Sequence, residues 1–213
     1  SDLHIRAMQT SARMLRAGQD VREYHLDAEL LHEFRLHGSQ FPAYTSIVAA
    51  GANACVLHYR ADVAPVRDGE LVLIDAGCEL DGYASDITRT FPANGKFSQA
   101  QRALYDIVLA AQQAAIDCTS PRHHWNAGHD AAVKVLTQGL LDVGLIQGSL
   151  EQAIESAAYR PFYMHRTGHW LGMDVHDVGS YREVSQSQSD TEKPWRILKS
   201  GMVITIEPGL YVR

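Results

Sequence analysis

The chain has 213 residues, of which 46% are hydrophobic and 21% charged, a composition typical of a folded globular protein. Its formal net charge is −6, from 19 Lys and Arg against 25 Asp and Glu, which disfavours binding to nucleic acid or to an anionic membrane. No apolar stretch approaches the about 20 residues needed to cross a bilayer, and the N-terminal residues lack the basic and apolar regions of a secretory signal.

The first half of the chain is predicted to contain two helices followed by strands. Apolar residues recur at helical spacing over 3–17 and 24–36, and a glycine follows each segment as a stop signal. Short β-leaning runs, separated by Gly, Asn, Asp and Pro, predict strands at 46–50, 55–59, 70–76 and 84–91. We expect these strands to form an antiparallel sheet.

The second half repeats this order. Ser98 is a good N-cap for a helix over 98–118, and further helices are predicted at 127–143 and 149–158. From residue 162 onward the pattern returns to strands and loops, and the polar segment 185–190 is expected to be a mobile loop.

An internal repeat supports two similar halves. Residues 68–77 (DGELVLIDAG) align without gaps on residues 200–209 (SGMVITIEPG), at an offset of 132 residues. The alignment places Asp75 and Glu207 at the same repeat position, where each carboxylate ends an apolar run. A chance match between two glycine-led apolar runs is the alternative explanation.

Three cysteines, Cys55, Cys78 and Cys118, fit neither a disulfide framework nor a zinc site, because they are odd in number and far apart. We expect them to be free core residues of a protein in the reducing cytoplasm. The chain begins without methionine and stops at Arg213, in the middle of what resembles a strand, so we also expect it to be a fragment.

Two acids flank the predicted hairpin. If residues 79–82 form a four-residue loop, Asp75 lies directly opposite Asp86 and both carboxylates project from the same face. Facing carboxylates repel, and burying an unpaired one costs several kcal/mol, so a positive group is expected between them. Arg89 lies on the opposite strand face from Asp86, which favours a metal cation. The alternative is that Asp75 is a satisfied cap and that Asp81 and Asp86 are ordinary turn acids.

Three of the eleven histidines, His165, His169 and His176, fall within one short segment. The first two have the spacing of a zinc-peptidase helix, but no glutamate follows His165 and Gly168 weakens a helix, so that motif is disfavoured. Several carboxylates with one or two imidazoles suit a harder ion, and two ions that share carboxylates suit hydrolysis.

Four motifs in this order resemble the pita-bread metallopeptidases over nearly the whole chain: LIDAGC at 73–78, ASDITRTF at 84–91, HRTGHWLGMDVHDVG at 165–179 and IEPGLY at 206–211. The resemblance implies an α+β pita-bread fold, with two pseudo-symmetric halves and a curved antiparallel sheet covered by helices. It also implies that residues 1–213 are one catalytic domain truncated at both ends, without the family's separate N-terminal domain and final strands.

The resemblance further implies two divalent metal ions, typically Mn²⁺, with a bridging carboxylate at Asp86. The ligands carried over from the family are Asp75, Asp86, His169 and Glu207. The family has a fifth ligand, a glutamate on the next strand, and the repeat likewise places the counterpart of Asp86 past Arg213. We therefore expect the chain as given to be a poor or inactive catalyst.

Catalytic roles also come from the resemblance. His176 is expected to stabilise negative charge on the scissile carbonyl oxygen, His58 and His165 to flank the substrate, and Glu207 to act as ligand and proton shuttle. Without the resemblance, a buried hydrogen-bonded histidine is the ordinary interpretation of His58. Tyr211 fits substrate contact and strand packing equally well. The residues expected to be exposed and structural, because they lie at a loop and a helix start, are His123, His124 and His129.

The implied activity is that of a metal-dependent aminopeptidase that hydrolyses the bond between an N-terminal residue and a following proline. Its partners would be peptides with proline at the second position, with no nucleic acid or membrane, and a homo-oligomer is left open. Alternatives on the same fold are a prolidase-type dipeptidase and a methionine aminopeptidase. A different class is a non-catalytic pita-bread module that binds peptides or proteins.

Overall fold

The computed structural model describes residues 2–183 and 193–213, so the loop predicted at 185–190 lies outside the described residues. The chain forms two compact units. The first comprises residues 1–100, 171–175 and 212–213, and the second comprises residues 101–170 and 176–211. Within the described residues, no helix is both long and apolar enough to span a membrane.

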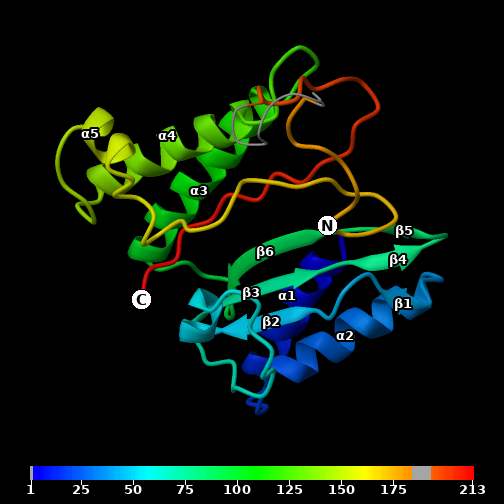
Figure 1. Ribbon diagram of the computed structural model, residues 1–213. Coiled ribbons are helices and arrows are strands. Elements are labelled where there is room, and N and C mark those ends of the chain that lie inside the picture. The colour runs from blue at the N-terminus through cyan, green and yellow to red at the C-terminus, as the bar shows by residue number, and fades with distance from the viewer. Residues whose placement is uncertain (1, 184–192) are drawn as a thin grey trace. The chain divides into compact units, whose positions relative to one another are not determined.

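The first unit is a helix pair packed on a sheet. The predicted helices are confirmed as α1 (Asp2–Arg16) and α2 (Glu23–Leu36). They cover one face of an antiparallel sheet with the order β2-β3-β6 (Figure 1), formed by β2 (Ile47–Ala50), β3 (Leu71–Ala76) and β6 (Ile87–Pro92). The core between helices and sheet includes Leu26, Leu30, Phe34, Val48, Val72, Ile74 and Phe91.

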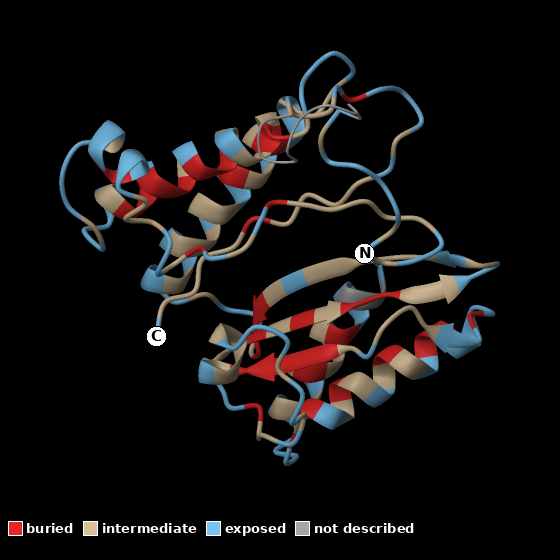
Figure 2. Ribbon diagram, viewed as in Figure 1, coloured by how far each residue is buried: buried red, intermediate tan, exposed pale blue. Residues whose placement is uncertain are grey.

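Alternation along β3 determines which way its acid points. Val72, Ile74 and Ala76 are buried in the core with the helices, as the alternating colours of β3 in Figure 2 show. Successive side chains of a strand point to opposite faces, so Asp75 projects from the face that the helices leave uncovered.

The hairpin register differs from the predicted one. Asp75 pairs with Thr88 rather than with Asp86. The chain reverses at Asp81 and Gly82, which both have positive φ (53° and 81°), as a two-residue hairpin turn requires, and not through a four-residue loop. A register change of two residues keeps side chains on their original face, so the two acids still share a side of the sheet.

The same hairpin belongs to a second small sheet. Its strands are β1 (Phe41–Pro42), β4 (Cys78–Leu80) and β5 (Tyr83–Ala84), in the order β1-β4-β5. The predicted strand at 84–91 is therefore divided between β5 and β6, with Ser85 and Asp86 between them.

The prediction of a strand at 55–59 was wrong. A 3₁₀ helix, η1 (Gly51–Cys55), is followed by a turn in which His58 has a φ of 53°. The side chains of Asn53 and Tyr59 donate hydrogen bonds to Glu23, a buried carboxylate of α2, and the segment pairs with no strand in the part of the chain that the structure describes. Tertiary contacts thus override the local β propensity.

The second unit contains the remaining helices. The predicted helices are confirmed as α3 (Gln99–Asp117), α4 (Ala127–Asp142) and α5 (Leu150–Glu155). Ser149 caps α5 by accepting a hydrogen bond from the Gln152 amide at 3.2 Å. Helix α5 ends before the predicted residue 158, and Ala157 has a left-handed φ of 54°.

The strands predicted after residue 162 are extended segments rather than regular strands. Segments 167–170 and 204–207 run antiparallel, with hydrogen bonds from the Thr205 amide to the His169 carbonyl (2.9 Å) and from the Glu207 amide to the Thr167 carbonyl (2.8 Å). Only an isolated bridge between Trp170 and Ile204 is formed among the described residues here.

The three cysteines are free thiols, as predicted, but they are half-buried rather than fully enclosed in a core. Of the three, Cys78 packs against the core of the first unit.

Candidate metal centre

In the first unit, two carboxylates meet at one tyrosine hydroxyl. Tyr44, between β1 and β2, bonds through its hydroxyl to Oδ1 of Asp75 and, at 3.0 Å, to Oδ1 of Asp86. Burial, followed by the negative charge of Asp75, raises the pKa of the Tyr44 hydroxyl far above its ordinary value, so the hydroxyl keeps its proton. One proton serves two acidic side chains, and a cation between these carboxylates would offset their remaining charge.

In the second unit, an imidazole and a carboxylate face each other. His169 Nε2 lies 3.2 Å from Oε1 of Glu207. The other ring nitrogen, Nδ1, lies 2.8 Å from the Trp170 carbonyl oxygen, which can only accept a hydrogen bond. The Nδ1–H tautomer is therefore assigned to the neutral ring, and it directs the Nε2 lone pair toward Glu207. Such an outer hydrogen bond is typical of metal-ligating histidines.

Thr205 connects these two residues. Its hydroxyl donates to Glu207 Oε1 at 2.9 Å and accepts a hydrogen bond from the His169 backbone amide at 3.0 Å. The hydroxyl thus orients the carboxylate without neutralising its charge. A lone pair and a carboxylate oxygen at this separation repel each other unless a proton or a metal cation lies between them.

Gly168 is required by the close approach of the two extended segments. A Cβ atom at this position would lie 2.1 Å from the Thr205 carbonyl oxygen and 3.0 Å from its carbon. Glycine therefore allows the backbone contact that brings His169 beside Glu207.

Two other predicted residues, His176 and His165, lie in the same unit as this pair. The His176 ring is exposed, and its centroid is 4.1 Å from that of His169. His165 contacts Tyr211, with 3.0 Å between Nε2 and the hydroxyl oxygen. Since Nδ1 of His165 lies 2.8 Å from the Arg166 carbonyl oxygen, the neutral ring accepts at Nε2 a hydrogen bond that Tyr211 donates.

His58 lies in the first unit, at the turn after η1. Its side chain is exposed, so the interpretation as a buried histidine was wrong, and its role beside a substrate stays a prediction. The exposed positions of His123 and His124 confirm their predicted surface location.

His129 is not exposed, contrary to the prediction. It is half-buried on α4, and its Nδ1 lies 2.8 Å from the Thr167 hydroxyl, which in turn lies 2.5 Å from the Tyr163 hydroxyl. Burial, and then the charge of Arg166, lowers the pKa of His129 to about 4. Burial also raises the pKa of Tyr163 to about 12. Through Thr167, this network includes a residue of segment 167–170, which carries His169.

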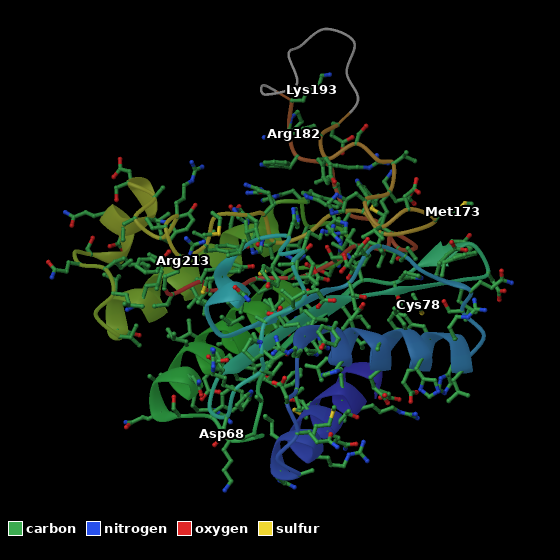
Figure 3. All side chains as sticks on the ribbon, turned by 90° about the horizontal axis from the view of Figure 1, so that it is seen from below. Asp68, Cys78, Met173, Arg182, Lys193 and Arg213 are labelled. Carbon is green, nitrogen blue, oxygen red and sulfur yellow. The ribbon has the colours of Figure 1, made fainter. Side chains whose placement is uncertain are left out.

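Arg182, an arginine of the second unit, contacts Lys193 and Trp195. Arg182 lies beside Lys193 (Figure 3) and donates to its carbonyl oxygen at 2.9 Å. The Arg182 guanidinium also stacks over the ring of Trp195, with its central carbon 3.2 Å from the ring centroid. We therefore assign Arg182 to these contacts with Lys193 and Trp195 rather than to the metal centre.

Tyr44 and Thr205, the two residues whose hydroxyls contact the candidate ligands, were not predicted from the sequence. Thr205 could have been found from alternation, since it lies two residues before Glu207 in an extended segment and thus on the same face. Tyr44 carried no comparable signal, because it lies outside the regular strands and reaches the acids only through the tertiary fold.

Comparison with known proteins assigns this chain to a family of metallopeptidases. The chain matches the model of metallopeptidase family M24 over residues 1–213 and belongs to that family. The fold is the pita-bread fold of aminopeptidase P. The structure of Pseudomonas aeruginosa aminopeptidase PepP superposes with a TM-score of 0.92 at 54% identity, covering 100% of this chain and 45% of that chain. The fold class predicted from the sequence is confirmed.

Two curated relatives are Xaa-Pro aminopeptidases. That of Haemophilus influenzae is 51% identical over 209 residues, and that of Escherichia coli K12 is 47% identical over 208 residues. In both cases the match covers 98% of this chain and 45% of the relative. The chain thus spans about half the length of these relatives. A structure of zinc-substituted E. coli aminopeptidase P with product has a TM-score of 0.88 at 45% identity, and covers 99% of this chain and 44% of that chain.

Proposed function

We propose that the protein is a metal-dependent aminopeptidase that hydrolyses the bond between an N-terminal residue and a following proline. The names of its relatives support this activity and a peptide substrate. The observation that carries the proposal is the placement of His169 Nε2 against Glu207 Oε1 at 3.2 Å, with Thr205 orienting the carboxylate. This is an arrangement of ligand atoms that fits a divalent cation.

The proposed ligands of two divalent cations are Asp75, Asp86, His169 and Glu207. Three carboxylates and one imidazole form a donor set that suits Mn²⁺ better than a thiolate-seeking metal, and we propose manganese on that ground. When bound, such cations polarise the scissile carbonyl and lower the pKa of coordinated water toward neutrality. That all four residues serve one centre is carried over from the family resemblance and is part of the proposal.

The other residues have separate proposed roles. His176 donates a hydrogen bond to the carbonyl oxygen as negative charge develops there. His165, with its ring oriented by Tyr211, and His58 flank the substrate and its proline. Glu207, which receives a hydrogen bond from Thr205 at 2.9 Å, moves a proton between water and the leaving amine.

The test is hydrolysis of defined peptides by the protein at its natural length, loaded with Mn²⁺. We expect release of the first residue from an Xaa-Pro tripeptide, little release from the matched Xaa-Ala tripeptide, and loss of activity in Glu207→Gln. Cleavage of the Xaa-Pro dipeptide alone would identify a prolidase-type enzyme. Preference for Met-Ala peptides would identify a methionine aminopeptidase, and binding without hydrolysis would identify a non-catalytic module.

We also propose the cytoplasm as the compartment. The three free thiols support a reducing environment. Fractionation of cells that express the protein would test this assignment.

A further inference from the structure

A single buried carboxylate holds a long segment of the first unit. Glu23, the first residue of α2, is 0% exposed. Its Oε1 accepts hydrogen bonds from the Ala50 amide at 2.8 Å and from Nδ2 of Asn53 at 3.0 Å. Its Oε2 accepts hydrogen bonds from the Tyr59 hydroxyl at 3.0 Å and from the Ala64 amide at 2.9 Å. Each carboxylate oxygen therefore has two donors.

These bonds explain how a full charge is tolerated in the core. An isolated buried carboxylate costs several kcal/mol, whereas a hydrogen bond to a charged acceptor contributes about 1.5–3 kcal/mol. The position of Glu23 in the first turn of α2 adds the favourable field of the helix N-terminus. The four donors fill the acceptor sites of the carboxylate, so Glu23 is a structural anchor rather than a group that contacts substrate.

The four donors come from the start, middle and end of segment 50–64, which also carries His58. Apart from Ala50, the last residue of β2, and η1, this segment has no regular helix or strand. Within it, the Val56 amide bonds to the Asn53 carbonyl at 2.9 Å, and the Tyr59 amide bonds to the Val56 carbonyl at 3.2 Å. His58 lies inside this turn, with a positive φ of 53° and an exposed side chain. Its position is thus set by neighbours that Glu23 holds.

We propose that Glu23 is a positioning residue for His58: by fixing segment 50–64 it sets the place and direction of the His58 imidazole. The inference rests on the proposed function, in which His58 flanks the substrate. It goes further because it assigns a role in turnover to a buried residue outside the predicted site.

The test compares Glu23→Gln with a matched control, Glu33→Gln. Glu33 is also a buried glutamate of α2, 6% exposed, but its carboxylate bonds to Arg6 at 2.7 Å, outside segment 50–64. Glutamine keeps the size of Glu23 but presents an NH₂ group to two donors. We expect Glu23→Gln to lower kcat/KM on an Xaa-Pro tripeptide at least 10-fold with bound metal unchanged, and Glu33→Gln to change it less than twofold.

A double-mutant cycle separates positioning from general stability. In the His58→Ala background, Glu23→Gln should lower kcat/KM less than twofold further, because the residue through which it acts is gone. An equal loss in both backgrounds, or no loss in either, would overturn the inference. If Glu23→Gln does not fold, Tyr59→Phe, which removes one of the four bonds, replaces it in the same cycle with a smaller expected loss.

Amide hydrogen exchange gives a readout that does not depend on activity. Exchange over residues 51–64 should accelerate in Glu23→Gln, while exchange in α3 stays as in the unsubstituted protein. Unchanged exchange over 51–64 would overturn the positioning role. Faster exchange in a protein that cleaves no Xaa-Pro peptide would instead show that the anchor is real and that the proposed function is wrong. Unchanged turnover in His58→Ala would remove the role of His58 and overturn the inference with it.

Discussion

Replacing Gly168 by alanine should weaken metal binding by pushing apart the two segments that carry His169 and Glu207. The new Cβ would lie 2.1 Å from the Thr205 carbonyl oxygen, whereas Cβ contacts below 3.0 Å essentially do not occur. Both sides of this contact are backbone, so the segments must separate by about 1 Å.

That separation would stretch the two backbone bonds between the segments, now 2.9 and 2.8 Å, beyond the hydrogen-bonding range. Their loss costs about 0.5–1.5 kcal/mol each, and the reduced freedom of the unfolded chain returns about 0.4–1 kcal/mol. We expect a net loss of about 1–2 kcal/mol in the free energy of unfolding. Because ligand distances must hold to about 0.2 Å, we also expect Mn²⁺ affinity to fall at least about 10-fold.

Gly201→Ala is the matched control. Gly201 has a φ of 90° and open space around its Cβ position, so alanine there is strained by its backbone angle alone, at a cost of about 1–2 kcal/mol. The two variants should lose similar stability in denaturant titrations, but calorimetric Mn²⁺ titration should show weaker binding only for Gly168→Ala. Equal metal affinity in both variants would refute the steric reasoning.

Three further predictions concern single side chains. Burial lowers the pKa of His129 to about 4, so this ring binds its proton more weakly in the folded than in the unfolded protein. The free energy of unfolding should therefore be highest above about pH 6.5 and decrease as the pH falls toward 4. Since this ring is only half-buried, we expect the loss to be about 1–2 kcal/mol, and a His129→Gln variant should show a correspondingly flatter pH profile in denaturant titrations. Tyr44→Phe removes the proton shared by two carboxylates, so the free energy of unfolding of the chelator-treated protein should fall by about 1–3 kcal/mol. Adding Mn²⁺ should then raise the melting temperature of this variant more than that of the unsubstituted protein. An equal rise in both would count against a metal at this pair. His176→Ala should keep its metal and lose about 100-fold in turnover, whereas His169→Ala should lose metal, and equal metal loss in both would mean that their roles are wrongly assigned.

The parts of the fold that follow local rules were predictable from the sequence. Helices α1 to α5 show the apolar period of 3.6 residues or a capping serine, and β3 is a clear apolar run that ends in an acid. The register of its hairpin was predictable as well, because the pair Asp81-Gly82 is a strong signal for a two-residue turn. The expectation of a longer loop gave too little weight to that pair.

The parts that failed depend on distant residues. Segment 55–59 has apolar and aromatic residues that favour a strand. Instead, Tyr59 and the preceding Asn53 donate hydrogen bonds to Glu23, which lies 30 or more residues earlier, and the segment forms a loop. The half-buried position of His129 depends on its partner Thr167, which is 38 residues away in the sequence. No local pattern contains these pairings, so they become visible only in the folded chain.

One candidate ligand in each half of the chain accepts a hydrogen bond from a neutral hydroxyl group. Asp75 and Glu207 occupy the same position of the internal repeat, and each receives a hydrogen bond from a neutral hydroxyl, from Tyr44 and Thr205 respectively. A neutral donor fixes the direction of a carboxylate and leaves its charge available to a cation, whereas a lysine or arginine would compete with the cation.

Thr205→Val should therefore lower Mn²⁺ affinity about 10-fold or more, with little change in the fold, because Glu207 keeps its charge but loses its orientation. Thr205→Ser, which restores the hydroxyl, should recover most of that affinity in calorimetric titration. If valine binds manganese as well as threonine does, the carboxylate is oriented by other contacts. The neutral hydroxyl would then have no part in holding the metal.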